Sequence, residues 1–251
     1  MQKPDRKTKE LLIHYAELYE TTDFLCGDPS WFMHQVEGPD NQEAMAFIAS
    51  CLSYGSRRQF MQKIRLVLDW AHGDVDGWVR NGLFGEQLRA GDTNCFYRLY
   101  NCDAMHRFLS AYRQLLLCHG SLGTYVRGRA CDGIGAVTAI CKYFSETDSG
   151  GIIPKDTSSA CKRVCMFLRW MVRNSSPVDL GLWADFIDRR SLIVPLDTHV
   201  LQQSYALGLL SCKTTTMKTA QRLTAALAEI FPDDPLKGDF ALFGHGVNSS
   251  H

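Results

Sequence analysis

Apolar residues recur at intervals of three and four positions in several separate segments of the chain. Residues three or four apart share one face of an α-helix, so each segment is expected to form an amphipathic helix. These segments are residues 11–19, 44–52, 64–71, 108–116 and 223–230. No segment shows a sustained alternation of apolar and polar residues, and no internal repeat is visible. The pattern predicts an all-α fold whose longer loops lie near residues 27–42, 72–95, 145–157 and 174–191.

A further helix is expected over residues 158–173, which contain no glycine or proline and follow the cap-type residue Thr157. On a helical wheel its apolar stripe lies opposite a face that carries Lys162, Met166, Arg169 and Arg173. The stretch 155–173 has five basic residues and one acidic residue, hence a net charge of +4 in a chain whose total is zero. This face is either an ordinary solvated surface or a binding surface for an anionic partner.

Lys162 lies near the start of this expected helix. The helix dipole disfavours a cation in the first turn, and partial burial disfavours it further. Both effects favour the neutral amine, which is a nucleophile. Lys162 is therefore a candidate catalytic residue, provided that a carboxylate lies beside it.

Residues 192–196 form an apolar segment that ends on Asp197, directly before Thr198, His199 and Val200. An Asp at this position accepts hydrogen bonds from the free backbone N–H groups of the next helical turn. Such free N–H groups also attract phosphate. Asp197 is either a plain helix cap or a carboxylate that also faces a nucleic-acid backbone.

Lys162 and the segment Leu196-Asp197-Thr198-His199-Val200 resemble the helix-hairpin-helix DNA glycosylase superfamily, in which a lysine opens the second hairpin helix and a later Val/Leu-Asp-x-His segment supplies the catalytic aspartate. The spacing of 35 residues between Lys162 and Asp197 looks more like the archaeal 8-oxoguanine DNA glycosylase branch. Residues 235–244 resemble the terminal helix of that branch, with Asp239 and Phe243 one turn apart. The match runs from about residue 43 onward, and the whole sequence also resembles a bacterial family with a domain of unknown function.

The resemblance implies two helical subdomains with a cleft between them, one over residues 24–150 and the other formed by residues 1–23 with 151–251. The cleft would hold Lys162 and Asp197 as the catalytic residues. Double-stranded DNA with a damaged base is the implied partner, a monomer is expected, and no cofactor is required.

The resemblance also implies how a damaged purine similar to 8-oxoguanine would be excised after it is swung out of the stack. Phe243 would stack on the base, Asp239 would accept its N–H groups, and Met166 would pack on its other side. The alternative for Phe243 is a helix end packed into the core. Lys162 would attack the sugar C1′ to form a Schiff base, and Asp197 would stabilise positive charge on the sugar.

Residues 53–59 follow a helix and lie where the relatives place a loop that wedges into DNA. Arg57 and Arg58 would fill the gap or contact phosphate there, or else form a solvated helix start. The expected DNA contacts extend to Lys155, Arg163, Arg169, His199 and Gln202.

Two features depart from the family pattern. The usual Leu-Pro-Gly-x-Gly hairpin before the lysine is absent, and residues 149–156 stand in its place with a Gly150-Gly151 pair. A better match in letters, Gly133-Ile134-Gly135, has Val137 at the position of the lysine, so we interpret it as the start of a helix. Gln202 stands where an arginine often follows the aspartate, which removes one charge from the expected DNA surface.

The ten cysteines do not support a metal site, because only Cys212 follows Asp197 and an iron–sulfur cluster in the endonuclease III relatives needs four. The sequence begins without a signal-peptide pattern and contains no apolar run near eighteen residues, so we expect a cytoplasmic protein with reduced thiols and no membrane segment. The cysteines are expected mostly as small core residues.

A net charge of zero argues against broad coating of nucleic acid and leaves room only for a local DNA-binding surface. Two alternatives to the enzyme therefore stay open. One is a catalytically silent DNA-binding protein on the glycosylase fold, which the altered hairpin and Gln202 favour. The other is a helical protein-interaction module, which would show no salt-dependent affinity for DNA.

Overall fold

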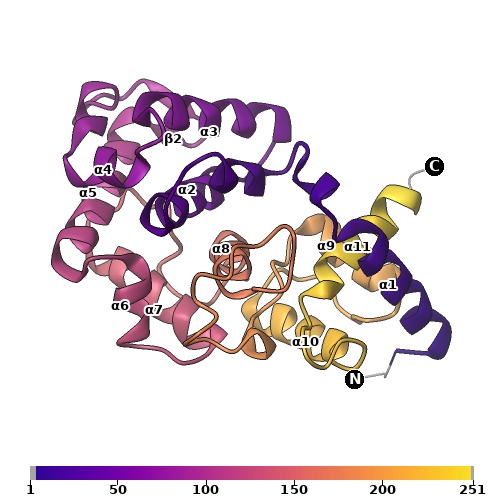
Figure 1. Cartoon of the computed structure of the whole chain (residues 1–251). Coiled ribbons are helices and arrows are strands. Elements are labelled where there is room, and N and C mark those ends of the chain that lie inside the picture. The colour runs from indigo at the N-terminus through magenta and orange to yellow at the C-terminus, as the bar shows by residue number, and fades with distance from the viewer. Residues whose placement is uncertain (1–3, 250–251) are drawn as a thin grey trace. The chain divides into compact units, whose positions relative to one another are not determined.

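The computed structural model describes residues 4–249 and confirms the all-α prediction. The α-helices are α1 (Arg6–Tyr19), α2 (Pro39–Leu52), α3 (Arg57–Ala71), α4 (Val75–Arg80), α5 (Cys102–His119), α6 (Leu122–Arg127), α7 (Gly133–Glu146), α8 (Lys162–Val172), α9 (Thr198–Ala206), α10 (Met217–Ala228) and α11 (Lys237–Ser249) (Figure 1). Short 3-10 helices are η1 (Thr22–Leu25), η2 (Pro29–His34), η3 (Leu83–Glu86) and η4 (Arg189–Ser191). All five segments with helical periodicity lie in these helices or, at residues 229–230, just beyond the end of α10.

One small antiparallel sheet interrupts the helical pattern. It consists of β1 (Cys95–Tyr97) and β2 (Tyr100–Asn101), in which Cys95 is opposite Asn101 and Tyr97 is opposite Tyr100. The sequence did not predict it, because strands of three and two residues are too short to show an alternating pattern. The segments expected as long loops also contain η2, α4, η3 and η4.

The chain forms two compact units, each built from segments that are distant in sequence. The first comprises the described residues up to Cys26, Cys131–Val137 and the residues from Thr157 onward. The second comprises Gly27–Ala130 and Thr138–Asp156. Helix α7 therefore begins in the first unit and continues in the second, and Lys162, Asp197 and Asp239 belong to the first.

In the second unit, α2 is the central helix. Every residue from Glu43 to Leu52 is buried, and Phe47 packs against Phe108, Tyr112 and Phe144. The buried Glu43 accepts hydrogen bonds from the backbone N–H groups of Leu122 (2.8 Å) and Gly123 (3.0 Å), so a core carboxylate caps α6.

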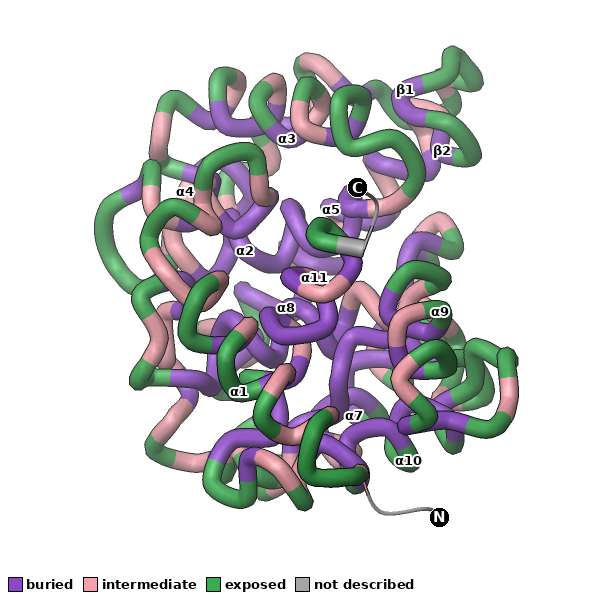
Figure 2. The backbone as a smooth tube through the Cα atoms, turned by 90° about the vertical axis from the view of Figure 1, so that its right-hand side faces the viewer, coloured by how far each residue is buried: buried purple, intermediate pink, exposed green. Residues whose placement is uncertain are grey.

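In the first unit, α8 is the buried helix, and residues Val164–Val172 are all shielded from solvent. Helices α1 and α11 lie side by side in this unit (Figure 1). Gly244 permits their close approach, since a Cβ at this position would overlap the ring of Tyr19. Figure 2 shows the buried course of α8 and the more exposed start of α1.

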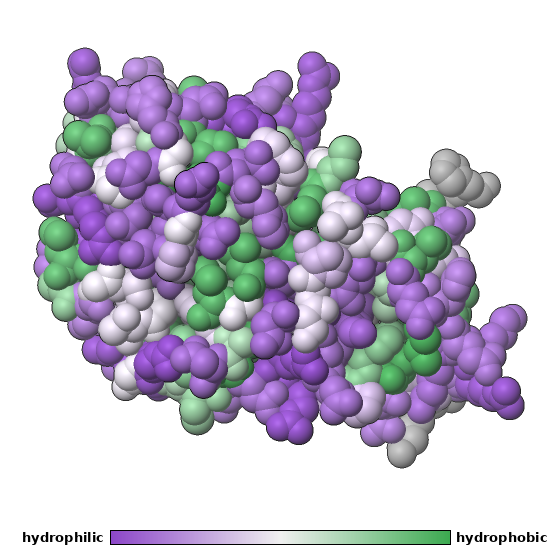
Figure 3. All heavy atoms as spheres, viewed as in Figure 1, coloured by the Kyte–Doolittle hydropathy of each residue, from purple (hydrophilic) through white to green (hydrophobic). Residues whose placement is uncertain are grey.

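Hydrophilic and hydrophobic residues are interspersed on the face drawn in Figure 3. Within the part of the chain that the structure describes, no helix combines the length and apolar character needed to cross a bilayer.

Candidate active site

The segment that leads to Asp197 is fixed by burial. Residues Leu192–Leu196 are all buried, and the Val194 N–H donates to Thr224 Oγ1 of α10 (3.0 Å). At the end of this segment Asp197 caps α9, and its Oδ1 accepts a hydrogen bond from the Val200 N–H (2.9 Å). The predicted helix cap is confirmed, and Oδ2 of the same carboxylate remains available to a second group.

Lys162 is the first residue of α8, so this helix begins four residues later than the sequence predicted. Residues before it are held in place by a bridge between Ser159 and Thr216 and by a hydrogen bond from the Ala160 N–H to the Thr215 carbonyl (3.3 Å). Cys161 has φ 46°, a left-handed conformation that ends the extended segment and turns the chain into α8. These contacts explain why Thr157 and Ser158 do not cap the helix.

The structure brings the two predicted catalytic residues together. Lys162 Nζ lies 3.8 Å from Asp197 Oδ2, and the side chains are 30% and 41% exposed. This distance is at the limit of an ion pair, and an exposed pair of this kind contributes little to stability. The arrangement therefore leaves an amine that solvent or a ligand can reach, next to a carboxylate that can exchange a proton with it.

Helix α11 contributes a third polar group to this region. The carboxylate of Asp239 is bound by the Arg169 guanidinium. Burial raises the pKa of Asp239, Arg169 opposes this shift, the charge of Asp197 adds to it, and Lys162 opposes it. Asp239 therefore lies within the electrostatic field of the Lys162–Asp197 pair.

The two apolar residues expected beside a bound base are packed to different degrees. Met166 is buried in α8. Phe243 is partly buried, and its ring makes edge contacts with Tyr19 (5.7 Å between centroids) and Phe24 (5.1 Å). Phe243 thus belongs to an aromatic cluster, as the alternative interpretation held, while part of its surface stays exposed.

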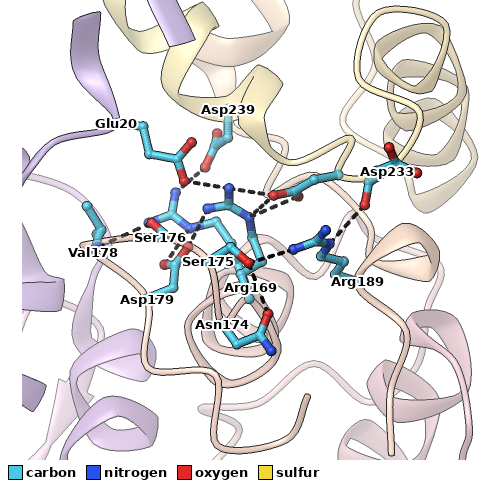
Figure 4. Close-up of polar contacts among 12 residues, drawn as sticks. Glu20, Arg169, Asn174, Ser175, Ser176, Val178, Asp179, Arg189, Asp233 and Asp239 are labelled. Carbon is cyan, nitrogen blue, oxygen red and sulfur yellow. Dashed lines mark hydrogen bonds and ion pairs between the residues drawn. The ribbon is translucent and has the colours of Figure 1, made fainter. Parts of the chain in front are cut away.

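The expected basic face of α8 is wrong, because Arg169 and Arg173 are buried (Figure 4). Arg169 binds Asp179 and Asp239, while Arg173 binds Asp179, Asp234 and Glu20. Both guanidinium groups also lie over the ring of Phe240. Arg169 is thus committed to an internal network and is not available to contact DNA phosphate.

Electrostatics within this buried arginine cluster are strongly coupled. Burial disfavours the charged form of Arg173, but Asp179, Asp234 and Glu20 outweigh it and raise the pKa of the guanidinium. Burial raises the pKa of Asp179, and Arg169 and Arg173 oppose that shift. The sequence signal for this cluster was two arginines one turn apart on an otherwise apolar helix, which a buried network requires as much as a basic surface does.

The other predicted DNA contacts have different environments. Lys155, His199 and Gln202 are exposed, and Arg163 is partly buried. The ring of His199 lies close to Gly246 of α11, where a Cβ would overlap it. In the second unit Arg57 and Arg58 are exposed and open α3, so they form a helix start rather than a loop.

The Gly133-Ile134-Gly135 motif begins α7, as predicted. Asp132 Oδ1 accepts from the Gly135 N–H (2.7 Å), and the Gly133 N–H donates to Ser191 Oγ (2.9 Å). A Cβ at Gly133 would overlap the carbonyl oxygen of Ser191 and lie 2.8 Å from the Cα of Leu192. The glycine therefore permits a close approach of two backbone segments within the first unit.

A separate cavity of about 480 Å³ opens in the first unit and is lined by Cys131, Val172, Asn174, Ala184, Asp185, Phe186, Ile187, Asp188 and Arg189. It includes none of the predicted site residues. Over residues 4–249, no three His, Cys, Asp or Glu side chains are grouped to hold a metal ion.

A family model described as "Protein of unknown function (DUF2400)" matches residues 28–248. Comparisons with curated proteins and with solved structures gave no significant match. The family match thus spans most of the chain and includes Lys162, Asp197 and Asp239.

Proposed function

The chain belongs to the DUF2400 family, and we propose that it is a DNA glycosylase with abasic-site lyase activity in which Lys162 is the nucleophile. The observation that carries the proposal is the approach of Lys162 Nζ to Asp197 Oδ2, 3.8 Å apart, at the starts of two helices. A lysine with a nearby carboxylate is the minimal set of groups for Schiff-base chemistry at an aldehyde carbon.

The first step of the proposed reaction separates a base from its sugar. The neutral amine of Lys162 forms a bond to C1′, and the electrons of the broken glycosidic bond leave with the base, which then takes up a proton. Asp197 stabilises the positive charge that develops on the sugar. Since the helix dipole disfavours a charged Lys162, the position of this amine at the start of α8 supports its role as nucleophile.

In the second step, opening of the sugar ring leaves a protonated Schiff base between Nζ and C1′. Loss of a proton from C2′ then expels the 3′ phosphate and cuts the strand. Asp197 Oδ2 lies beside the nitrogen and is the acceptor nearest to this chemistry. Base recognition is proposed for the exposed part of Phe243 and for Asp239, with an oxidised purine as the substrate class.

One observation favours a second candidate, a catalytically silent DNA-binding protein. The carboxylate of Asp197 stabilises the charged form of the lysine beside it, and a charged amine is not a nucleophile. In this case Lys162 would hold a phosphate group rather than attack a sugar.

Borohydride trapping distinguishes these functions. The purified protein is incubated with duplexes that carry 8-oxoguanine or an abasic site, and the covalent adduct is measured after reduction. We expect an adduct with the wild-type protein and none with Lys162→Gln, while Lys155→Gln serves as the matched control because Lys155 is exposed and lies outside the pair. Salt-sensitive binding without an adduct would support the silent DNA-binding protein, and the absence of DNA binding would exclude both.

A further inference from the structure

The turn between β1 and β2 presents one apolar side chain to solvent. Arg98 and Leu99 form this turn, and Arg98 has φ 51°. Leu99 is 87% exposed, more than any other large hydrophobic residue in the described part of the chain. Figure 2 shows the exposed residues of this hairpin beyond the buried parts of its strands. An isolated leucine in such a position has no role in the core.

The turn is held firmly by the residues at the end of α2. Tyr54 Oη donates to the Tyr97 carbonyl (3.2 Å) and accepts from the Leu99 N–H (3.4 Å), and Tyr97 Oη donates to the Tyr54 carbonyl. The Tyr54 ring also packs against Tyr97 and Tyr100 (centroids 5.0 and 5.2 Å apart). Leu99 is therefore presented on a fixed support, which lowers the entropic cost of using it in binding.

Three arginines lie on or next to the same support. Arg98 Nη1 would be 2.8 Å from a Cβ at Gly55, so its side chain covers the segment that leads directly to Arg57 and Arg58. All three arginines are exposed, and none forms an ion pair within the part of the chain that the structure describes. No acidic residue stands in the first turn of α3.

We infer that Arg57, Arg58, Arg98 and Leu99 form a duplex-binding edge, in which Leu99 inserts between base pairs and the arginines contact phosphates. Aliphatic side chains act as wedges between base steps, and unpaired arginines bind the phosphate backbone. A single leucine among charged residues is too small to form the apolar centre of a protein interface, which buries about 800 Å² on each partner. The choice of DNA as the partner class rests on the proposed function.

The experiment uses a duplex with 2-aminopurine next to an abasic site, because the fluorescence of this base increases when it loses its stacking partners. Fluorescence and affinity are measured for the wild-type protein, Leu99→Ala and the control Leu117→Ala, whose leucine is 54% exposed on α5. We expect Leu99→Ala to lose the fluorescence increase and to bind about tenfold more weakly, since unstacking a step costs a few kcal/mol that the wedge compensates. Leu117→Ala should behave as the wild type.

Borohydride trapping on a single-stranded abasic oligonucleotide separates this inference from the proposed function, because a single strand needs no wedge. We expect Leu99→Ala to trap the single strand at the wild-type rate. If Leu99→Ala matched the wild type on the duplex in both fluorescence and affinity, the inference would be overturned while trapping by the wild type upheld the enzyme. If the wild type neither trapped nor bound DNA, both would fall; loss of unstacking in Leu99→Ala without any trapping would support the edge and reject the chemistry.

Discussion

At the scale of single residues, Asp197 combines two roles that substitution can separate. Its Oδ1 caps α9, and its Oδ2 faces Lys162. Asp197→Asn should retain the cap, because asparagine caps a helix as well as aspartate does, but it should abolish borohydride trapping. Asp197→Ala should lose trapping and also about 1 kcal/mol of unfolding free energy, measured by urea titration. Undiminished trapping by Asp197→Asn would restrict the residue to its role as a cap.

Arg173 is the residue on which the buried cluster depends most. Its guanidinium binds Asp234 through Nε (3.0 Å) and Nη2 (2.7 Å), Asp179 through Nη1 (2.5 Å) and Glu20 through Nη2 (2.5 Å). Arg173→Met should lower the free energy of unfolding by about 3–5 kcal/mol, because carboxylates would remain buried without their partner. The matched control is Arg190→Met, an exposed arginine paired with Asp188, for which urea unfolding should be unchanged. Equal stability of the two variants would contradict this account of the cluster.

At the scale of elements, the start of α7 depends on a close backbone approach. Gly133→Ala should destabilise the protein by about 1–3 kcal/mol, because its Cβ would overlap the Ser191 carbonyl and force the segment 191–192 to move. Gly128→Ala is the control, since its Cβ would meet the nearest backbone oxygens at 3.9 Å, an ordinary contact, and its φ is −75°. Urea unfolding of both variants measures the difference. A neutral Gly133→Ala would show that the approach is easily relaxed.

Helix periodicity was sufficient to predict elements but not their environments. The stripes at 44–52 and 64–71 predicted α2 and α3 because spacing alone decides which residues share a helical face. Spacing could not reveal that Arg169 and Arg173 are buried, because their partners Asp234 and Glu20 lie 61 and 153 residues from Arg173. For the same reason the Lys162–Asp197 approach was expected from a family resemblance, since 35 intervening residues fix no distance.

At the scale of the whole molecule, a net charge of zero limits DNA binding to local surfaces. The exposed or partly buried cations expected to contact phosphate are Arg57, Arg58, Arg98, Lys155 and Arg163. Each phosphate contact releases counterions, so the slope of log K against log salt should be roughly −4.5 if all five contribute at about −0.9 each.

This slope also tests which residues make the contacts. Arg57→Gln should make it shallower by about 0.9, measured by fluorescence anisotropy across a salt series. Arg6→Gln should leave it unchanged, because Arg6 is exposed but paired with Glu10 (2.7 Å) on α1. A wild-type slope near zero would mean that the unpaired arginines do not meet phosphate, and the helical surface would then be better explained as a site for another protein.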